Sequence, residues 1–121
     1  MNSPNSGIEI LKTLEKCELA AITFVRDYVQ FSFDGPHLSV YSRPRIKTPD
    51  YMFNLATPGY RDALCGQIGK LVIKVFEEPK EKLLIEFENQ VIIEISLKEE
   101  DRNGPEAAML QVDSGKRWNV W

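Results

Sequence analysis

The sequence of 121 residues is poor in the side chains that carry most catalytic and metal chemistry. It contains one histidine, His37, and two cysteines, Cys17 and Cys65. A Ser-His-Asp or Cys-His site needs a base beside its nucleophile, and only His37 could supply one. The sequence has no G-x-S-x-G elbow, no C-x-x-C spacing for zinc and no calcium-loop spacing. We therefore expect no catalytic residue, no metal and no cofactor, and predict that the protein is not an enzyme.

Long apolar runs are also absent. The longest run, Leu19–Val25, has seven residues, far fewer than the roughly 20 that a membrane-spanning helix needs. The opening MNSPNSGIEI has neither a basic stretch nor an apolar core, so it does not have the form of a signal peptide. Two cysteines are too few for a disulfide framework. These absences predict a reduced, cytoplasmic protein that has no membrane partner.

Positive charge is in slight deficit. The chain has 15 Lys and Arg residues against 18 Asp and Glu residues, which gives a formal net charge of −3. The first sixty residues carry six of each sign, and the remainder carries nine basic and twelve acidic residues. Proteins that bind nucleic acid take much of their affinity from a basic surface. We therefore expect no nucleic-acid partner, and the uneven acidity indicates an acidic surface in the second half.

The residues that are present have the composition of a folded globular domain. Hydrophobic residues make up 43% of the chain and charged residues 27%, both ordinary values for such domains. A chain of this length corresponds to one domain and buries roughly two-thirds of its unfolded surface without help from disulfides or metals. We predict a single domain over residues 1–121.

The spacing of apolar residues predicts the same order of elements in both halves. Ile10 and Leu14 recur at helical spacing, which predicts a helix over residues 7–17, and Thr57-Pro58 has the form of a second helix start. Each helix is followed by three segments with strand patterns. These segments are residues 19–25, 29–34 and 37–41 in the first half, and 71–76, 83–88 and 91–97 in the second.

The two halves can also be aligned directly. The stretch Phe31–Gly35 matches Ile85–Asn89, and after the turn Leu38 matches Val91. The alignment predicts an internal duplication with halves at approximately 6–43 and 57–98 and a C-terminal extension at 99–121. In the extension, a short helix is predicted to begin at Pro105, and the alternating end of the chain is predicted to add an edge strand.

These patterns together predict an α+β fold. Two helix-plus-three-strand units would form an antiparallel sheet or a partly closed barrel with two packed helices. The predicted core residues are Leu14, Ile22, Phe24, Phe31, Phe33, Val40, Leu64, Ile68, Ile73, Val75, Ile85, Phe87, Ile93 and Ile95.

Five residues are candidates for contact with a partner. Glu86, Glu88 and Glu94 should share the outer face of one hairpin, as a solvated strand face or as an acidic surface for a basic toxin or enzyme. Trp118 and Trp121 should pack the tail onto the sheet, or form a contact across a homodimer, since tryptophan is enriched at interface hot spots.

The segment around the single histidine is a candidate ligand site. His37 follows the turn residues Gly35-Pro36, and alternation places it on the polar face of a strand with Tyr41, just before Arg43. His37, Tyr41 and Arg43 could therefore contact a small ligand. The plainer interpretation is a solvated histidine at a strand end, which we favour because the aligned hairpin of the second half has no histidine.

Two short motifs resemble a known group of proteins. Asp62-Ala-Leu-Cys65 and, later, Gly104-Pro-Glu-Ala107 resemble a family of small, uncharacterised bacterial α+β proteins over roughly residues 19–112. Some of its members resemble immunity proteins, which neutralise toxins made by the same cell. The resemblance implies no catalytic residues.

These observations predict a non-enzymatic cytoplasmic interaction protein, with an immunity-type inhibitor of a toxin as its most specific form. Two alternatives stay open. One is a small-ligand-binding protein that uses the polar face around His37. The other is a homodimeric structural module joined through an edge strand or the tryptophan-containing tail.

Overall fold

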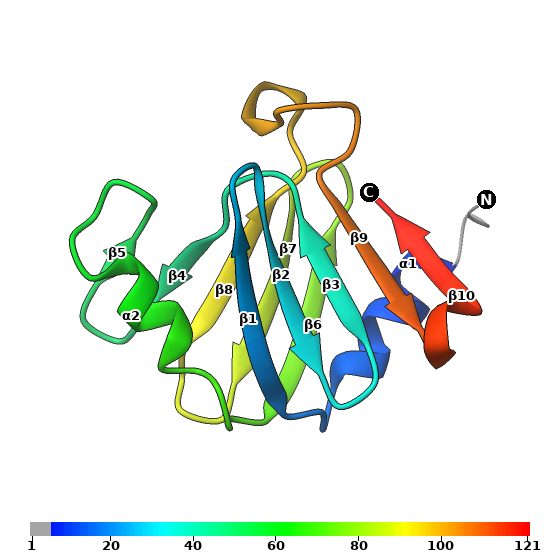
Figure 1. The fold of residues 1–121 in the computed structure, drawn as a ribbon, viewed down its shortest axis with the longest axis horizontal. Helices are drawn as coiled ribbons and strands as arrows, with labels where there is room; N and C mark the ends of the chain where they lie inside the picture. Colours follow the sequence, from blue (N-terminus) through cyan, green and yellow to red (C-terminus); the bar gives the residue numbers. More distant parts are fainter. Residues whose placement is uncertain (1–5) are drawn as a thin grey trace.

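The computed structural model describes residues 6–121, so the first five residues of the opening segment considered for a signal peptide lie outside it. Ten strands form two antiparallel sheets of five strands each, which lie as two layers (Figure 1). The first sheet has the order β1 (Leu19–Val25), β2 (Tyr28–Phe33), β3 (His37–Val40), β9 (Ala108–Val112) and β10 (Arg117–Val120). The second has the order β5 (Met52–Phe53), β4 (Arg45–Lys47), β8 (Ile92–Ser96), β7 (Lys82–Phe87) and β6 (Val72–Glu78).

The helices are short. Helix α1 (Ser6–Leu11) continues only as a 3₁₀ turn, Lys12–Leu14, and helix α2 (Tyr60–Cys65) also has six residues. A further 3₁₀ turn spans Glu99–Asp101, and a turn in the left-handed conformation spans Asp113–Gly115. Helix α1 packs against β6, β9 and β10, and α2 packs against β1 and β4. Each helix therefore fills an end of the space between the two layers (Figure 1).

The predicted α+β fold with two packed helices is wrong, because the protein is mostly β and has two sheets. The second helix, predicted to run up to Gly69, ends already at Cys65, although Gly69 has the left-handed conformation predicted for it, with a φ of 91°. The connection that followed the third predicted strand forms β4 and β5 instead. The helix expected at Pro105 is absent, whereas the predicted edge strand at the chain end exists as β10.

The two sheets share one connectivity. After the three-strand meander β1-β2-β3, the chain crosses to the other sheet, where β4 pairs with β8; after β6-β7-β8 it crosses back, where β9 pairs with β3. The first strand of each meander carries a bulge at the same place, between Leu19 and Ala21 and between Val72 and Lys74. Each half therefore consists of a three-strand meander followed by a strand that pairs in the other sheet.

The junction between the meanders is a reciprocal pair of hydrogen bonds. The Leu19 amide donates to the Lys70 carbonyl at 3.1 Å, and the Val72 amide donates to the Cys17 carbonyl at 2.9 Å. Between them, Glu18 and Leu71 form an antiparallel bridge. The two halves are thus related by an approximate two-fold axis at this bridge.

The register of the third strands differs from the predicted alignment. Phe31 pairs with Leu38 in the first meander, and its counterpart Ile85 pairs with Ile93 in the second. Leu38 therefore corresponds to Ile93, two residues beyond the predicted Val91. The parity of the strand is unchanged, so the same residues still face the core.

A single hydrophobic core lies between the sheets and includes Phe31, Leu38, Ile46, Ile85 and Phe87. The predicted core residues are buried except for four. Ile73 is 53% exposed because it lies in the bulge, and Ile68 is exposed because α2 ends before it. Phe24, near the end of edge strand β1, is 38% exposed, and Ile22 is half-buried.

Among the described helices, none is both long and apolar enough to cross a membrane.

The core assignment predicts unequal effects of two phenylalanine truncations. Phe31→Ala should lower the free energy of unfolding by about 3–5 kcal/mol, because it removes a ring that is only 1% exposed. Phe24→Ala, at 38% exposure, should cost clearly less. Urea denaturation of both variants measures this, and equal costs would contradict the arrangement of the core.

Candidate functional site

The three predicted acidic residues do not form one free carboxylate surface. Glu94 on β8 lies 3.1 Å from Arg45 and 3.8 Å from Lys82, so two cations already surround it. Glu88 accepts a hydrogen bond from the Leu71 amide at 3.0 Å, which holds the turn after β7 to the start of β6. Glu86 lies in register with a lysine, Lys74. Two of the three carboxylates of this hairpin therefore already have partners within the fold.

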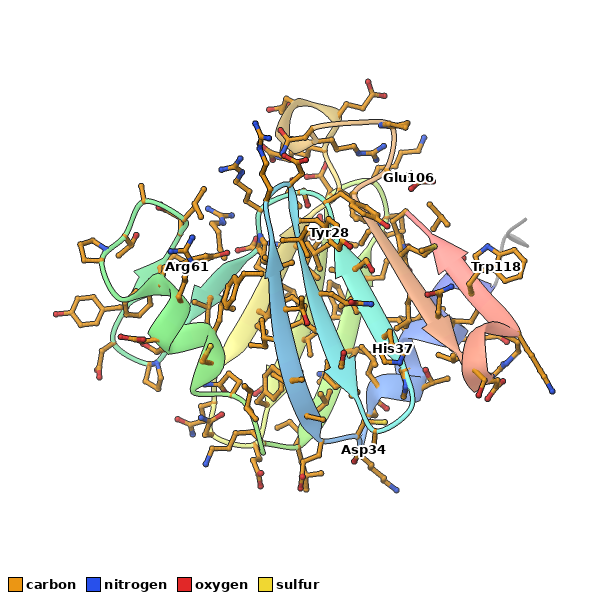
Figure 2. The ribbon with its side chains drawn as sticks, in the orientation of Figure 1. Tyr28, Asp34, His37, Arg61, Glu106 and Trp118 are labelled. Carbon is orange, nitrogen blue, oxygen red and sulfur yellow. The ribbon has the colours of Figure 1, made fainter. Side chains whose placement is uncertain are left out.

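The two tryptophans have different environments. Trp118 on β10 is 42% exposed and points away from the body of the sheet (Figure 2). Trp121 is half-buried, and its amide donates to the Ala108 carbonyl at 2.9 Å. Packing of the tail thus accounts for Trp121, while a dimer contact through Trp118 stays a prediction.

One of the four edge strands is partly capped. The Val75 amide of β6 donates to the Glu15 carboxylate at 3.2 Å, and α1 packs against this strand. Capping of this kind hinders pairing with another strand. The predicted homodimer through an edge strand therefore has less unpaired backbone available at β6 than the topology alone provides, whereas most of β1 is exposed.

The three predicted ligand residues separate into two places. His37 begins β3 and is exposed, with its Nδ1 3.2 Å from the Ser32 hydroxyl. Tyr41, after the other end of this strand, packs its ring 5.5 Å from that of Tyr28. His37 and Tyr28 lie at opposite ends of the sheet (Figure 2). Tyr41 also lies four residue steps after His37, which is roughly 13 Å in an extended chain.

Tyr41 and Arg43 line a hollow of about 180 Å³ at the end of the first sheet. Its walls come from the β1–β2 turn, the segment that links β3 to β4, and α2. The lining residues are Phe24, Val25, Arg26, Asp27, Tyr28, Val29, Val40, Tyr41, Ser42, Arg43, Pro44, Leu55, Tyr60 and Arg61. We call this site the arginine hollow.

The three arginines that line the arginine hollow come from separate elements. Arg26 lies in the β1–β2 turn, Arg43 follows β3, and Arg61 is in α2. Within residues 6–121, none of them lies within ion-pair distance of a carboxylate. Arg61 instead lies 5.6 Å over the ring of Phe24 in a cation–π contact. Three arginines and one aspartate, Asp27, therefore line the hollow beside its aromatic walls, and none of the three arginines forms an ion pair in the described structure.

Tyr60 forms the buried side of the arginine hollow. Its hydroxyl donates to the Pro44 carbonyl at 2.6 Å. Burial raises its pKa to about 12, while the positive charges of Arg43 and Arg61 act in the opposite direction. The charges of both arginines therefore reach the Tyr60 hydroxyl, which agrees with their convergence on one site.

A larger open groove of about 880 Å³ adjoins the arginine hollow and shares Arg43 and Leu55 with it. The groove lies between segment 54–56, the β4 and β8 strands, and the loop that follows β8. Its lining residues are Arg43, Arg45, Asn54, Leu55, Ala56, Glu94, Ser96, Lys98, Glu100, Asp101, Arg102 and Asn103. We call it the β4 groove.

Hydrogen bonds hold the loop on one side of the β4 groove in place. The Ser96 hydroxyl donates to the Asp101 carboxylate at 2.5 Å. The Arg102 guanidinium donates to the carbonyls of Leu97 and Pro105 at 2.7 and 2.8 Å. The groove therefore has a defined wall on this side.

Sequence reasoning missed Arg26 and Arg61. A signal was present, because all three arginines of the hollow lie within two residues of a tyrosine, as Arg26-Asp27-Tyr28, Tyr41-Ser42-Arg43 and Tyr60-Arg61. Only the fold shows that these three pairs converge. Among the residues described, His, Cys, Asp and Glu side chains form no group of three or more that could hold a metal ion.

Comparisons with protein-family models, curated proteins and solved structures found no match. The family resemblance of the two sequence motifs stays a prediction.

The Tyr60–Pro44 hydrogen bond predicts a loss of stability in Tyr60→Phe. The variant leaves a buried carbonyl without its donor, which should cost about 1–3 kcal/mol of unfolding free energy. Chemical denaturation measures the loss. A variant as stable as the parent protein would show that this contact does not hold α2 against the β3–β4 segment.

The raised pKa of Tyr60 predicts a pH dependence of stability. Its pKa of about 12 in the folded protein exceeds the ordinary value of 10, so the unfolded chain loses this proton first as the pH rises. The stabilisation should be complete below pH 10 and decline between pH 10 and about 12. Over that interval the parent protein should lose more stability than Tyr60→Phe, and parallel pH profiles would contradict the assignment.

Proposed function

We propose that the protein is a non-enzymatic interaction module that takes a negatively charged group of its partner into the arginine hollow. The observation that supports this is that Arg26, Arg43 and Arg61 line one hollow without forming an ion pair in the described structure, against a single lining carboxylate, that of Asp27. Guanidinium groups bind carboxylates and phosphates through paired hydrogen bonds. An anionic group supplied by a partner would complete these contacts.

The size of the hollow suits a small charged group of the partner and not a whole drug-sized molecule. Sites for drug-sized molecules have volumes of roughly 300–1,000 Å³, and the arginine hollow has about 180 Å³. Its aromatic walls, Phe24, Tyr28 and Tyr41, offer ring faces against which the apolar part of a bound acidic group can pack. These features favour a single acidic side chain or a group of similar size.

The positive charge of the arginine hollow affects which kind of partner we expect. An acidic face for a basic toxin has weaker support, because Glu94 already contacts Arg45 and Lys82. An inhibitor of the immunity type would here meet an acidic region of its target. In that form the immunity-type role is compatible with the arginine hollow.

Benzoate tests the proposed function, because it combines a carboxylate with an aromatic ring, and benzamide is a neutral control of nearly the same shape. The protein should bind benzoate at least about tenfold more tightly than benzamide, since a charge-assisted hydrogen bond contributes about 1.5–3 kcal/mol. Arg43→Gln and Arg61→Gln should each remove most of this preference. Titration calorimetry or ligand-observed NMR measures it.

The matched control is Arg117→Gln. Arg117 pairs with Asp113 beside β10, at the other end of the molecule, so benzoate affinity should be unchanged in this variant. Equal affinity for benzoate and benzamide, or an equal loss in all three variants, would refute the arginine hollow as an anion site.

A further inference from the structure

We infer that the partner presents an extended acidic peptide segment, which lies along the β4 groove and places one carboxylate in the arginine hollow. This inference rests on the proposed function and adds the chemical class of the partner. Its support comes from the internal symmetry of the fold, from the continuity of the two sites, and from the charges along the groove.

The internal symmetry explains why the β4 groove is open. Phe53 pairs with Ile46 on β4, as Asn119 pairs with Leu110 on β9, so β5 and β10 occupy equivalent positions. Strand β10 has four residues and β5 only two. The position of an edge strand is therefore fully occupied in one half of the molecule and only partly in the other.

The residue after β10 shows what fills the equivalent position. Trp121 continues the pairing, with its amide bonded to the Ala108 carbonyl at 2.9 Å and its carbonyl accepting from the Ala107 amide at 2.7 Å. After β5 the chain turns away instead, because the Thr57 amide donates to the Asn54 carbonyl at 2.9 Å. In the other half of the molecule, the equivalent position is therefore occupied by an extended segment of chain.

The backbone beside the open position differs from its counterpart in the other half. Pro44 corresponds to Ala108, because Ile46 pairs with Ile93 as Leu110 pairs with Leu38. The Pro44 carbonyl is bonded by the Tyr60 hydroxyl and not by a strand amide. A segment in the β4 groove would therefore be held mainly by side chains, and its recognition would depend on charge.

The charges along the path favour acidic residues. Arg43 lines both the hollow and the groove, and Arg45, Lys98 and Arg102 line the groove beyond it. Arg45 and Lys98 form ion pairs with Glu94 and Glu81, and Glu100 and Asp101 add carboxylates to the groove lining. Over the groove and the hollow together, six arginines and lysines still outnumber four carboxylates. Arg43, where the two sites join, has no ion-pair partner in the described chain, so an incoming carboxylate is favoured most at this point.

The test compares blocked peptides of about eight residues, which span roughly 26 Å when extended. One peptide alternates Glu and Ala, a second has Gln in place of each Glu, and a third keeps one Glu. The alternating Glu peptide should bind at least about tenfold more tightly than the Gln peptide, and clearly more tightly than the single-Glu peptide. Fluorescence anisotropy of labelled peptides measures these affinities.

Ala56 provides a matched pair of variants, because it is exposed and lines the β4 groove but not the hollow. Ala56→Glu should weaken binding of the alternating Glu peptide about tenfold through charge repulsion, whereas Ala56→Gln, of the same size, should bind nearly as the parent protein does. Benzoate affinity should be the same in both variants, which also shows that they are folded.

Three results would overturn the inference. They are equal binding of the alternating Glu and single-Glu peptides, equal binding of the alternating Glu peptide by the two Ala56 variants, and tighter binding of a single-stranded oligonucleotide of the same net charge. Any of these together with normal benzoate binding would leave the proposed function intact and reject only the extended acidic segment. Loss of benzoate discrimination would instead reject both.

Discussion

The exchange of strands between the two meanders is the constraint on which the rest of the structure depends. Strand β4 follows the first meander but pairs with β8, and β9 follows the second but pairs with β3. Each five-stranded sheet is therefore completed only by the strands that follow the other meander. The reciprocal hydrogen bonds of Leu19 and Val72 then hold the starts of the two meanders together. The single core is a consequence of this arrangement, because residues of both sheets face one shared space.

The same arrangement explains why the two ends of the molecule differ in chemistry. The helix and strand positions are equivalent, but the chain fills them unequally. At one end, α1 and the continuation of β10 through Trp121 occupy the space beside β9. At the other, a two-residue β5 leaves the β4 edge short of neighbours, and Tyr60 bonds the Pro44 carbonyl instead. The arginine hollow and the β4 groove therefore arise where an approximately symmetric fold is incomplete.

The sequence predicted the strands better than it predicted the fold. Alternation at Phe31 and Ile85 identified the core faces, because a period of two is set locally by the backbone. The fold class was wrong for a different reason: whether β4 pairs within its own half or across to β8 depends on contacts far apart in the chain. The exposure of the Ile73 side chain was not predicted either, because a bulge reverses the alternation locally. The candidate site was predictable only for Tyr41 and Arg43, because Arg61 reaches it through the packing of α2.

We propose that guanidinium groups without ion-pair partners in the arginine hollow receive an anionic group. This can be tested by titration of the ¹⁵N-labelled protein with benzoate, followed through the arginine side-chain Nε–Hε signals in NMR spectra. The signals of Arg43 and Arg61 should shift with saturation, while that of Arg117 should stay in place. Uniform small shifts of all the arginine signals, or a saturating shift confined to Arg117, would contradict it.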